Sequence, residues 1–154
     1  MLIGAQQRNS YMEARDAYAR FCAAHGIAPV IAVADESGGE DAGHDACVSL
    51  LSDHPEIDGL CALVDTFAVG AVRAIGQLGA PVPQDIKVVT RYDGQRARAC
   101  RPPLTVVDLH LDDMVSQAVE LLFAHLAAAK GKDGVARSVA PALPELVKRE
   151  SSGA

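Results

Sequence analysis

The stretch of residues 55–90, PEIDGLCALVDTFAVGAVRAIGQLGAPVPQDIKVVT, decides the fold class. It contains two short and nearly continuous apolar runs, Ile57–Val64 and Ile86–Thr90, which are typical of buried strands. Between these runs, apolar side chains recur at the spacing of one helix face: Phe67, Ala71, Ala74, Ile75 and Leu78, with Gly79 as a stop. A buried strand, a helix and a second buried strand in this order predict a parallel sheet covered by helices.

The same alternation continues on both sides of this stretch. Upstream, we expect a strand stub at residues 1–4, a helix over 11–25, a strand over 28–34 and a helix over 43–51. Downstream, we expect a basic loop over 91–101, a strand over 104–107, a long helix around 115–126 and a last strand over 142–148. The predicted fold class is α/β, with a three-layer parallel sheet flanked by helices and joined by right-handed crossovers.

Composition excludes several classes of protein. A length of 154 residues fits one domain, and a net charge of −6 argues against direct DNA binding, because phosphate contacts need a basic face. We find no apolar run long enough to span a membrane and no secretion signal at the N-terminus, so no membrane contact is expected. The widely spaced Cys22, Cys47, Cys61 and Cys100 predict buried, reduced thiols rather than a zinc site. We expect no cofactor, since no phosphate-binding loop motif appears.

Several motifs, in order and at matching gaps, resemble the C-terminal part of transcription regulators of the LacI/GalR family. They are Pro55–Asp65, a strand that ends in Asp; Thr66–Ile75, the helix after it; Val82–Val89 (VPQDIKVV); Pro102–Thr105 (PPLT); and the closing segment Pro144–Ser151. Before residue 55 the match is carried by Ile3-Gly4, Arg15, Gly26-Ile27 and the loop from Ser37 to Gly43. The resemblance covers essentially all 154 residues and implies the C-terminal lobe of an effector-binding domain of periplasmic binding protein type I-like architecture.

The resemblance also implies a domain plan. Residues 1–108 would form the C-terminal lobe, residues 109–150 the crossover helix and strand that in the family complete the N-terminal lobe, and residues 151–154 a frayed tail. Without that lobe, the apolar stripe of the helix around 115–126 would face water, so we expect the tail either to swap onto a second chain or to repack on its own sheet.

Function follows from the same resemblance. It implies a cytoplasmic regulator that is not an enzyme and that binds a small-molecule effector. Operator DNA would be bound only through a helix-turn-helix headpiece, which is absent from this chain. It also implies a homodimer, with Phe67, Ala71 and Leu104 as contacts, although Phe67 and Ala71 fit the helix–sheet core equally well.

The candidate effector site lies where ligands sit in open α/β sheets, beyond the carboxyl ends of the strands. The residues expected there are Ser10, Tyr11 and Arg15 after the first strand, Asp65 after the third, and Arg91, Tyr92 and Asp93 after the fourth. Asp65 fits either a ligand contact or a helix N-cap, as does Ser10; Arg15 is one residue out of register when counted from Tyr18.

Three departures from the family pattern bear on the effector. Val64 replaces an Asn, Tyr92 replaces an Asp that is often a sugar ligand, and Arg91 has no counterpart. A guanidinium at position 91 could clamp a carboxylate or phosphate, or be one more solvated arginine. The effector is therefore expected to be sugar-like or a small anionic metabolite.

Two other classes remain open at this stage. A solute-binding protein of a sugar transporter shares the lobes and would need an export signal. An enzyme on a flavodoxin-like sheet would need a nucleophile or a phosphate loop, and we find neither in the sequence.

Overall fold

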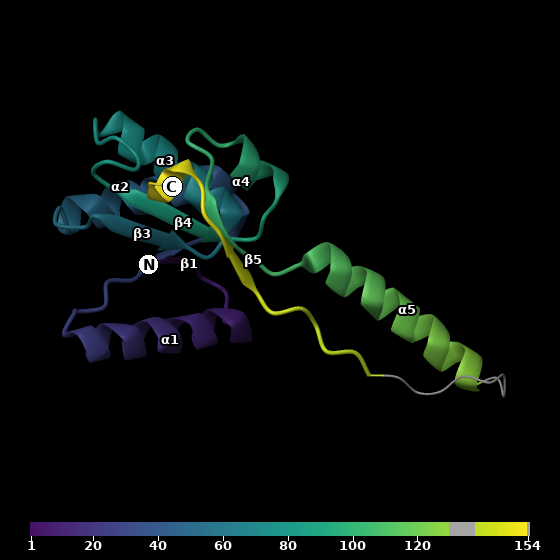
Figure 1. The fold of residues 1–154 in the computed structure, drawn as a ribbon. Helices are drawn as coiled ribbons and strands as arrows, with labels where there is room; N and C mark the ends of the chain where they lie inside the picture. Colours follow the sequence, from purple (N-terminus) through teal and green to yellow (C-terminus); the bar gives the residue numbers. More distant parts are fainter. Residues whose placement is uncertain (130–137, 154) are drawn as a thin grey trace.

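The computed structural model describes residues 1–129 and 138–153, and it forms one six-stranded sheet with strand order β2-β1-β3-β4-β5-β6 (Figure 1). The strands are β1 (Leu2–Gly4), β2 (Ala32–Ala34), β3 (Gly59–Ala62), β4 (Lys87–Arg91), β5 (Thr105–Asp108) and β6 (Glu145–Val147). The first five strands pair in parallel, as the sequence predicts. The chain moves from β1 to β2 in one direction and to β3, β4 and β5 in the other, so the order reverses between β1 and β3.

Helices cover the sheet unevenly. Helix α1 (Asn9–His25) lies on one face, and α2 (Gly39–Asp53) and α3 (Asp65–Gln77) lie on the other (Figure 1). Successive side chains at β1 point to opposite faces of the sheet. Leu2 therefore packs in the core beneath α2 and α3, whereas Met1 and Ile3 pack in the core beneath α1. The predicted helices therefore form, although α2 begins at Gly39 rather than at 43, after the one-turn helix η1 (Glu36–Gly38).

The contact between α2 and α3 depends on two glycines. A Cβ atom on Gly70 would collide with the Glu40 carbonyl oxygen and lie 2.7 Å from the His44 backbone nitrogen. A Cβ on Gly43 would likewise collide with the Phe67 backbone. The two helix backbones thus approach as closely as glycine alone allows.

This packing corrects the predicted dimer contacts. Phe67, Ala71 and Leu104 are each 0% exposed and belong to the core that α2 and α3 form on the sheet. A side chain without exposed surface cannot contact a second chain in this conformation. The alternative of a helix–sheet core is correct for Phe67 and Ala71.

The last strand departs from the prediction. Strand β6 pairs with β5 in antiparallel fashion, Val107 opposite Leu146, so the sheet is mixed rather than wholly parallel. The strand thus packs on its own sheet, as one of the two expected outcomes for the tail. Helix α5 (Leu111–Ala129) projects away from the sheet and has no buried residue (Figure 1).

The C-terminal residues are not frayed over the part that the structure describes. Ser151 is 0% exposed, in the one-turn helix η2 (Glu150–Ser152). Its hydroxyl donates to the Val88 carbonyl (2.6 Å) and accepts from the Thr105 amide (2.8 Å). The prediction of a frayed tail is wrong here because these bonds fasten the segment to β4 and β5; Ala154 lies outside the described residues.

Two further features complete the fold. The predicted basic loop contains a short helix, α4 (Gln95–Ala99), whose Ala97 is buried.

Cys22 and Cys47 are buried, while Cys61 and Cys100 are partly exposed, and all four are free thiols. Within residues 1–129 and 138–153, no helix has the length and apolar character needed to cross a bilayer.

Candidate functional site

The carboxyl ends of β1, β2 and β4 bring together polar and aromatic side chains from distant parts of the sequence. Tyr11 comes from the first turns of α1, Glu36 from the segment after β2, and Arg91 and Tyr92 from the end of β4. These ends flank the reversal of strand order between β1 and β3, which is where open α/β sheets bind ligands. We call Arg8, Tyr11, Glu36, Arg91 and Tyr92 the switch-point cluster.

One half of the cluster is a hydrogen-bonded triad. The Tyr11 hydroxyl donates to Glu36 Oε1 at 2.7 Å, and Arg8 Nη2 donates to Glu36 Oε2 at 2.8 Å. Burial, together with the bond to Glu36, raises the pKa of Tyr11 to about 12, so its hydroxyl stays protonated and keeps donating. Gly4 makes room for this triad, because a Cβ there would collide with the Glu36 carboxylate and lie 2.7 Å from the Tyr11 ring.

The other half is an arginine held by two aromatic rings. The guanidinium carbon of Arg91 lies 4.8 Å from the ring centre of Tyr92 and 5.8 Å from that of Tyr11. Its Nε atom is buried and has no hydrogen-bond partner. No carboxylate among the described residues pairs with Arg91, so its charge is balanced only by the faces of the rings.

Tyr92 carries backbone strain. Its φ is 74°, in the left-handed region that bulky residues seldom adopt, while its amide donates to the Val107 carbonyl at 3.1 Å. Such a conformation costs about 1–3 kcal/mol and persists where neighbouring structure enforces it, often at binding sites.

Asp65 lies at the same end of the sheet. Its Oδ2 is 3.9 Å from the place where a Cβ on Gly94 would sit, and 3.7 Å from Arg96 Nη1. Its other oxygen accepts from the Thr66 amide at 2.9 Å, in the first turn of α3. The N-cap of α3 is Val64, so the prediction of Asp65 as the cap is wrong; Asp65 is the first residue of the helix, and its position is compatible with a role toward a ligand.

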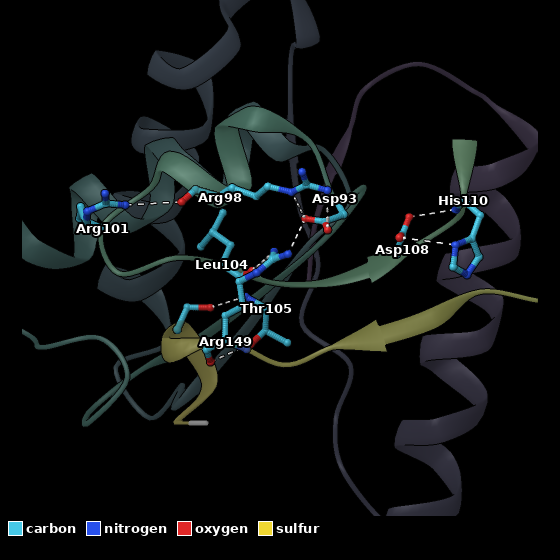
Figure 2. A network of polar contacts seen from close by, with 9 residues as sticks. Asp93, Arg98, Arg101, Leu104, Thr105, Asp108, His110 and Arg149 are labelled. Carbon is cyan, nitrogen blue, oxygen red and sulfur yellow. Dashed lines mark hydrogen bonds and ion pairs between the residues drawn. The ribbon is translucent and has the colours of Figure 1, made fainter. Parts of the chain in front are cut away.

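Asp93 is an anchor in this structure rather than a free ligand (Figure 2). Its side chain is 10% exposed, and its two oxygens accept from Arg149 Nη2 (2.7 Å) and from the Arg98 guanidinium (3.0 and 3.2 Å). The hydrogen bonds from Arg98 and Arg149 lower the pKa of Asp93. Arg149 also donates to the Leu104 carbonyl, so the end of the chain fixes the loop that follows Tyr92.

A hollow of about 290 Å³ lies beside this anchor. It is lined by Tyr92, Asp93 and Arg98 together with Asp108, His110 and the first residues of α5. His110, with a φ of 51°, donates its backbone amide to Asp108 Oδ1, and its ring nitrogen Nδ1 lies 3.6 Å from Oδ2 of the same residue (Figure 2). Among the described residues, no group of three histidine, cysteine or acidic side chains is placed to hold a metal ion.

Two predicted site residues do not join the cluster. Ser10 is exposed and is not the N-cap of α1, which begins at Asn9 after Arg8. Arg15 is exposed on α1 and forms no ion pair or side-chain hydrogen bond with the described part of the chain. The sequence did not single out Arg8 and Glu36, which form an ion pair at the same end of the sheet.

Comparison with known proteins places the whole chain in one family of domains. A family model described as a periplasmic binding protein-like domain matches residues 1–152. The transcriptional repressor PurR of Histophilus somni (strain 129Pt), of the helix-turn-helix type, is 37% identical over 87 residues, which are 56% of this chain and 25% of that protein.

Solved structures of transcription regulators are also similar to this chain. The transcription regulator GntR from Chromobacterium violaceum superposes with a TM-score of 0.85 at 27% identity, over 99% of this chain and 56% of that one. A LacI family regulator from Arthrobacter sp. FB24, in complex with lactose, gives a TM-score of 0.78 at 27% identity, over 97% of this chain and 55% of that one. This chain therefore spans about a quarter of the curated relative and about half of each solved chain.

Proposed function

Because the chain belongs to the periplasmic binding protein-like domain family, we propose that it is the effector-binding module of a LacI/GalR-type transcription regulator. One observation carries the proposal: the switch-point cluster gathers Tyr11, Glu36, Arg91 and Tyr92 at the carboxyl ends of parallel strands. Hydrogen-bonding and aromatic groups in this place suit a small polar molecule. The lactose bound by the Arthrobacter regulator has this character.

The same proposal assigns DNA binding to another part of the full-length protein. The matched span is a quarter of the PurR repressor, and the net charge of this chain is −6, which does not suit a phosphate-binding face. We therefore propose that operator DNA is bound by a helix-turn-helix headpiece outside these residues. The module would act in the cytoplasm, as a binding protein without catalytic activity.

Helix α5 supports the proposed domain plan. Its apolar side chains face solvent, with Phe123 67% exposed and Leu122 57% exposed. An apolar surface of this kind marks a contact with another unit. We propose that α5 helps to complete an N-terminal lobe in the full-length regulator, whereas β6 stays on the sheet described above. We also propose that the regulator is a homodimer through surfaces other than Phe67, Ala71 and Leu104.

A thermal-shift screen tests the effector-binding function. A ligand at 100 times its Kd stabilises by about 2.7 kcal/mol, which is a rise in Tm of about 5–10 °C for a chain of this size. We expect a sugar-sized ligand to give this rise with the wild type and not with Tyr11→Ala or Tyr92→Ala. Exposed Ser52→Ala in α2 is the control that should respond as the wild type does. An equal rise in all four proteins would place the ligand elsewhere, and turnover of the ligand would contradict a binding module.

A further inference from the structure

Arg91 differs from the arginines around it in having no anionic partner. Arg8 binds Glu36, Arg96 lies 3.7 Å from Asp65, and both Arg98 and Arg149 bind Asp93. Within residues 1–129 and 138–153, Arg91 has neither an ion pair nor a side-chain hydrogen bond, and its Nε is buried without a partner.

The position of Arg91 prepares it for a planar anion. The rings of Tyr11 and Tyr92, with centres 5.8 and 4.8 Å away, hold the guanidinium carbon. Contacts with aromatic rings leave the N–H donors, which lie in the plane of the guanidinium, free for a carboxylate or a phosphate. A buried donor without a partner is costly, and an anion that supplies the partner recovers that cost.

The nearby carboxylates would not repel such an anion. The charge of Glu36 is matched by Arg8 and by the Tyr11 hydroxyl, and that of Asp93 by two arginines. Asp65 lies beside Arg96. Once these pairs are counted, the uncompensated charge of the switch-point cluster is the positive charge of Arg91.

We infer that Arg91, framed by Tyr11 and Tyr92, is an anion subsite that takes the carboxylate or phosphate group of a small effector. The inference rests on the proposed function and narrows it, because the effector becomes an anionic metabolite rather than a neutral sugar. Carboxylate and phosphate share the bidentate acceptor geometry that the guanidinium recognises.

Intrinsic tyrosine fluorescence provides a direct assay. The chain has three tyrosines and no tryptophan, and two of the tyrosines are the rings that flank Arg91. Titrations of the 154-residue chain use glucose, glucuronate and glucose 6-phosphate, which differ at C6, together with inorganic phosphate at constant ionic strength. The variants are Arg91→Gln and Arg91→Lys, and Arg20→Gln, exposed on α1, is the control for loss of one charge.

We expect at least one of the three anions to change the fluorescence and glucose to be at least tenfold weaker. Arg91→Gln should lower the anion affinity about tenfold to a hundredfold. Arg91→Lys should lower the anion affinity several-fold, because lysine keeps the charge but lacks the paired N–H donors of the planar guanidinium. Arg20→Gln should leave the affinity unchanged. A response to glucuronate alone identifies a carboxylate source, and a response to either phosphate compound identifies a phosphate source.

Two outcomes overturn the inference. Binding of glucose as tight as that of the best anion, with the affinity of both unchanged in Arg91→Gln, would retain an effector site and remove the anion subsite. No Arg91-dependent response to any anion would also remove it, and the proposed function would then depend on the thermal-shift screen alone. Urea unfolding of each variant confirms that it is folded. Arg91→Gln breaks no ion pair or side-chain hydrogen bond among the described residues and loses only the contacts with the Tyr11 and Tyr92 rings, so the variant should remain folded.

Discussion

The two glycines of helix α3 allow a sharp test of the packing that supports the switch-point cluster. Gly70 and Gly76 lie in the same helix, but a Cβ on Gly70 would collide with the backbone of α2, whereas one on Gly76 would meet no atom within 4 Å. Alanine gains about 0.8–1 kcal/mol over glycine within a helix. Gly76→Ala should therefore raise the free energy of unfolding by about that amount.

Gly70→Ala should act in the opposite direction. It has the same gain in helix propensity, but its methyl group displaces the Glu40 carbonyl and the His44 amide, which are backbone groups and cannot turn aside. Overpacking costs about 1–3 kcal/mol and more where backbone must move, so the net loss should be about 2 kcal/mol. Urea unfolding followed by circular dichroism measures both variants. If the two alanines changed stability in the same direction and by the same amount, the close contact of α2 and α3 would be refuted.

Three other predictions concern the ends of the strands. Ser151→Ala leaves the Val88 carbonyl and the Thr105 amide unpaired and should cost about 2–4 kcal/mol in urea unfolding; a loss no larger than that of the exposed Ser52→Ala would contradict the buried role. Since Arg98 and Arg149 lower the pKa of Asp93, the stability they add should be complete above the unfolded carboxyl pKa of about 3.9 and should be lost as the pH falls through the folded value. In Asp93→Asn the urea midpoint should therefore depend less on pH below pH 4 than in the wild type. An unchanged pH dependence would argue against a structural role for the Asp93 ion pairs. Gly4→Ala should displace Tyr11 and Glu36 at a cost of about 1–3 kcal/mol, and an unaltered midpoint together with unaltered tyrosine fluorescence would disprove the close approach.

Local patterns predicted most of the fold. The alternation of apolar runs and helical stripes predicted the order of the first five strands and of helices α1, α2 and α3, but not the short helices η1 and α4. The resemblance to the LacI/GalR family is confirmed by the relatives and the solved structures. The direction of β6 could not be predicted, because the three residues Glu145–Val147 carry no side-chain pattern that favours one direction of pairing. The burial of Ser151 could not be predicted either, since its hydrogen-bond partners, Thr105 and Val88, lie 46 and 63 residues away in the sequence.

Only part of the candidate site could be predicted from the sequence. The rule that ligands lie beyond the carboxyl ends of strands brought Tyr11, Arg91 and Tyr92 to one place, and the structure puts their side chains in contact. The same rule also selected Asp93 as a ligand contact, but in the structure its carboxylate forms ion pairs with Arg98 and Arg149. It could not assign Phe67 either, because a dimer contact and a core contact have the same apolar spacing until α2 is placed over α3.

Amide mapping by nuclear magnetic resonance tests most directly whether a small molecule binds at the switch point. The ¹⁵N-labelled chain would be titrated with the compound that gives the largest thermal stabilisation in the screen. We predict that the largest chemical-shift changes fall in the segments that carry the cluster, residues 5–11, 35–37 and 90–94, and that Arg91→Gln needs about tenfold to a hundredfold more ligand to give them. Changes confined to the opposite end of the sheet, around Val82 and Pro102, or to helix α5 would contradict a binding site at the carboxyl ends of the strands.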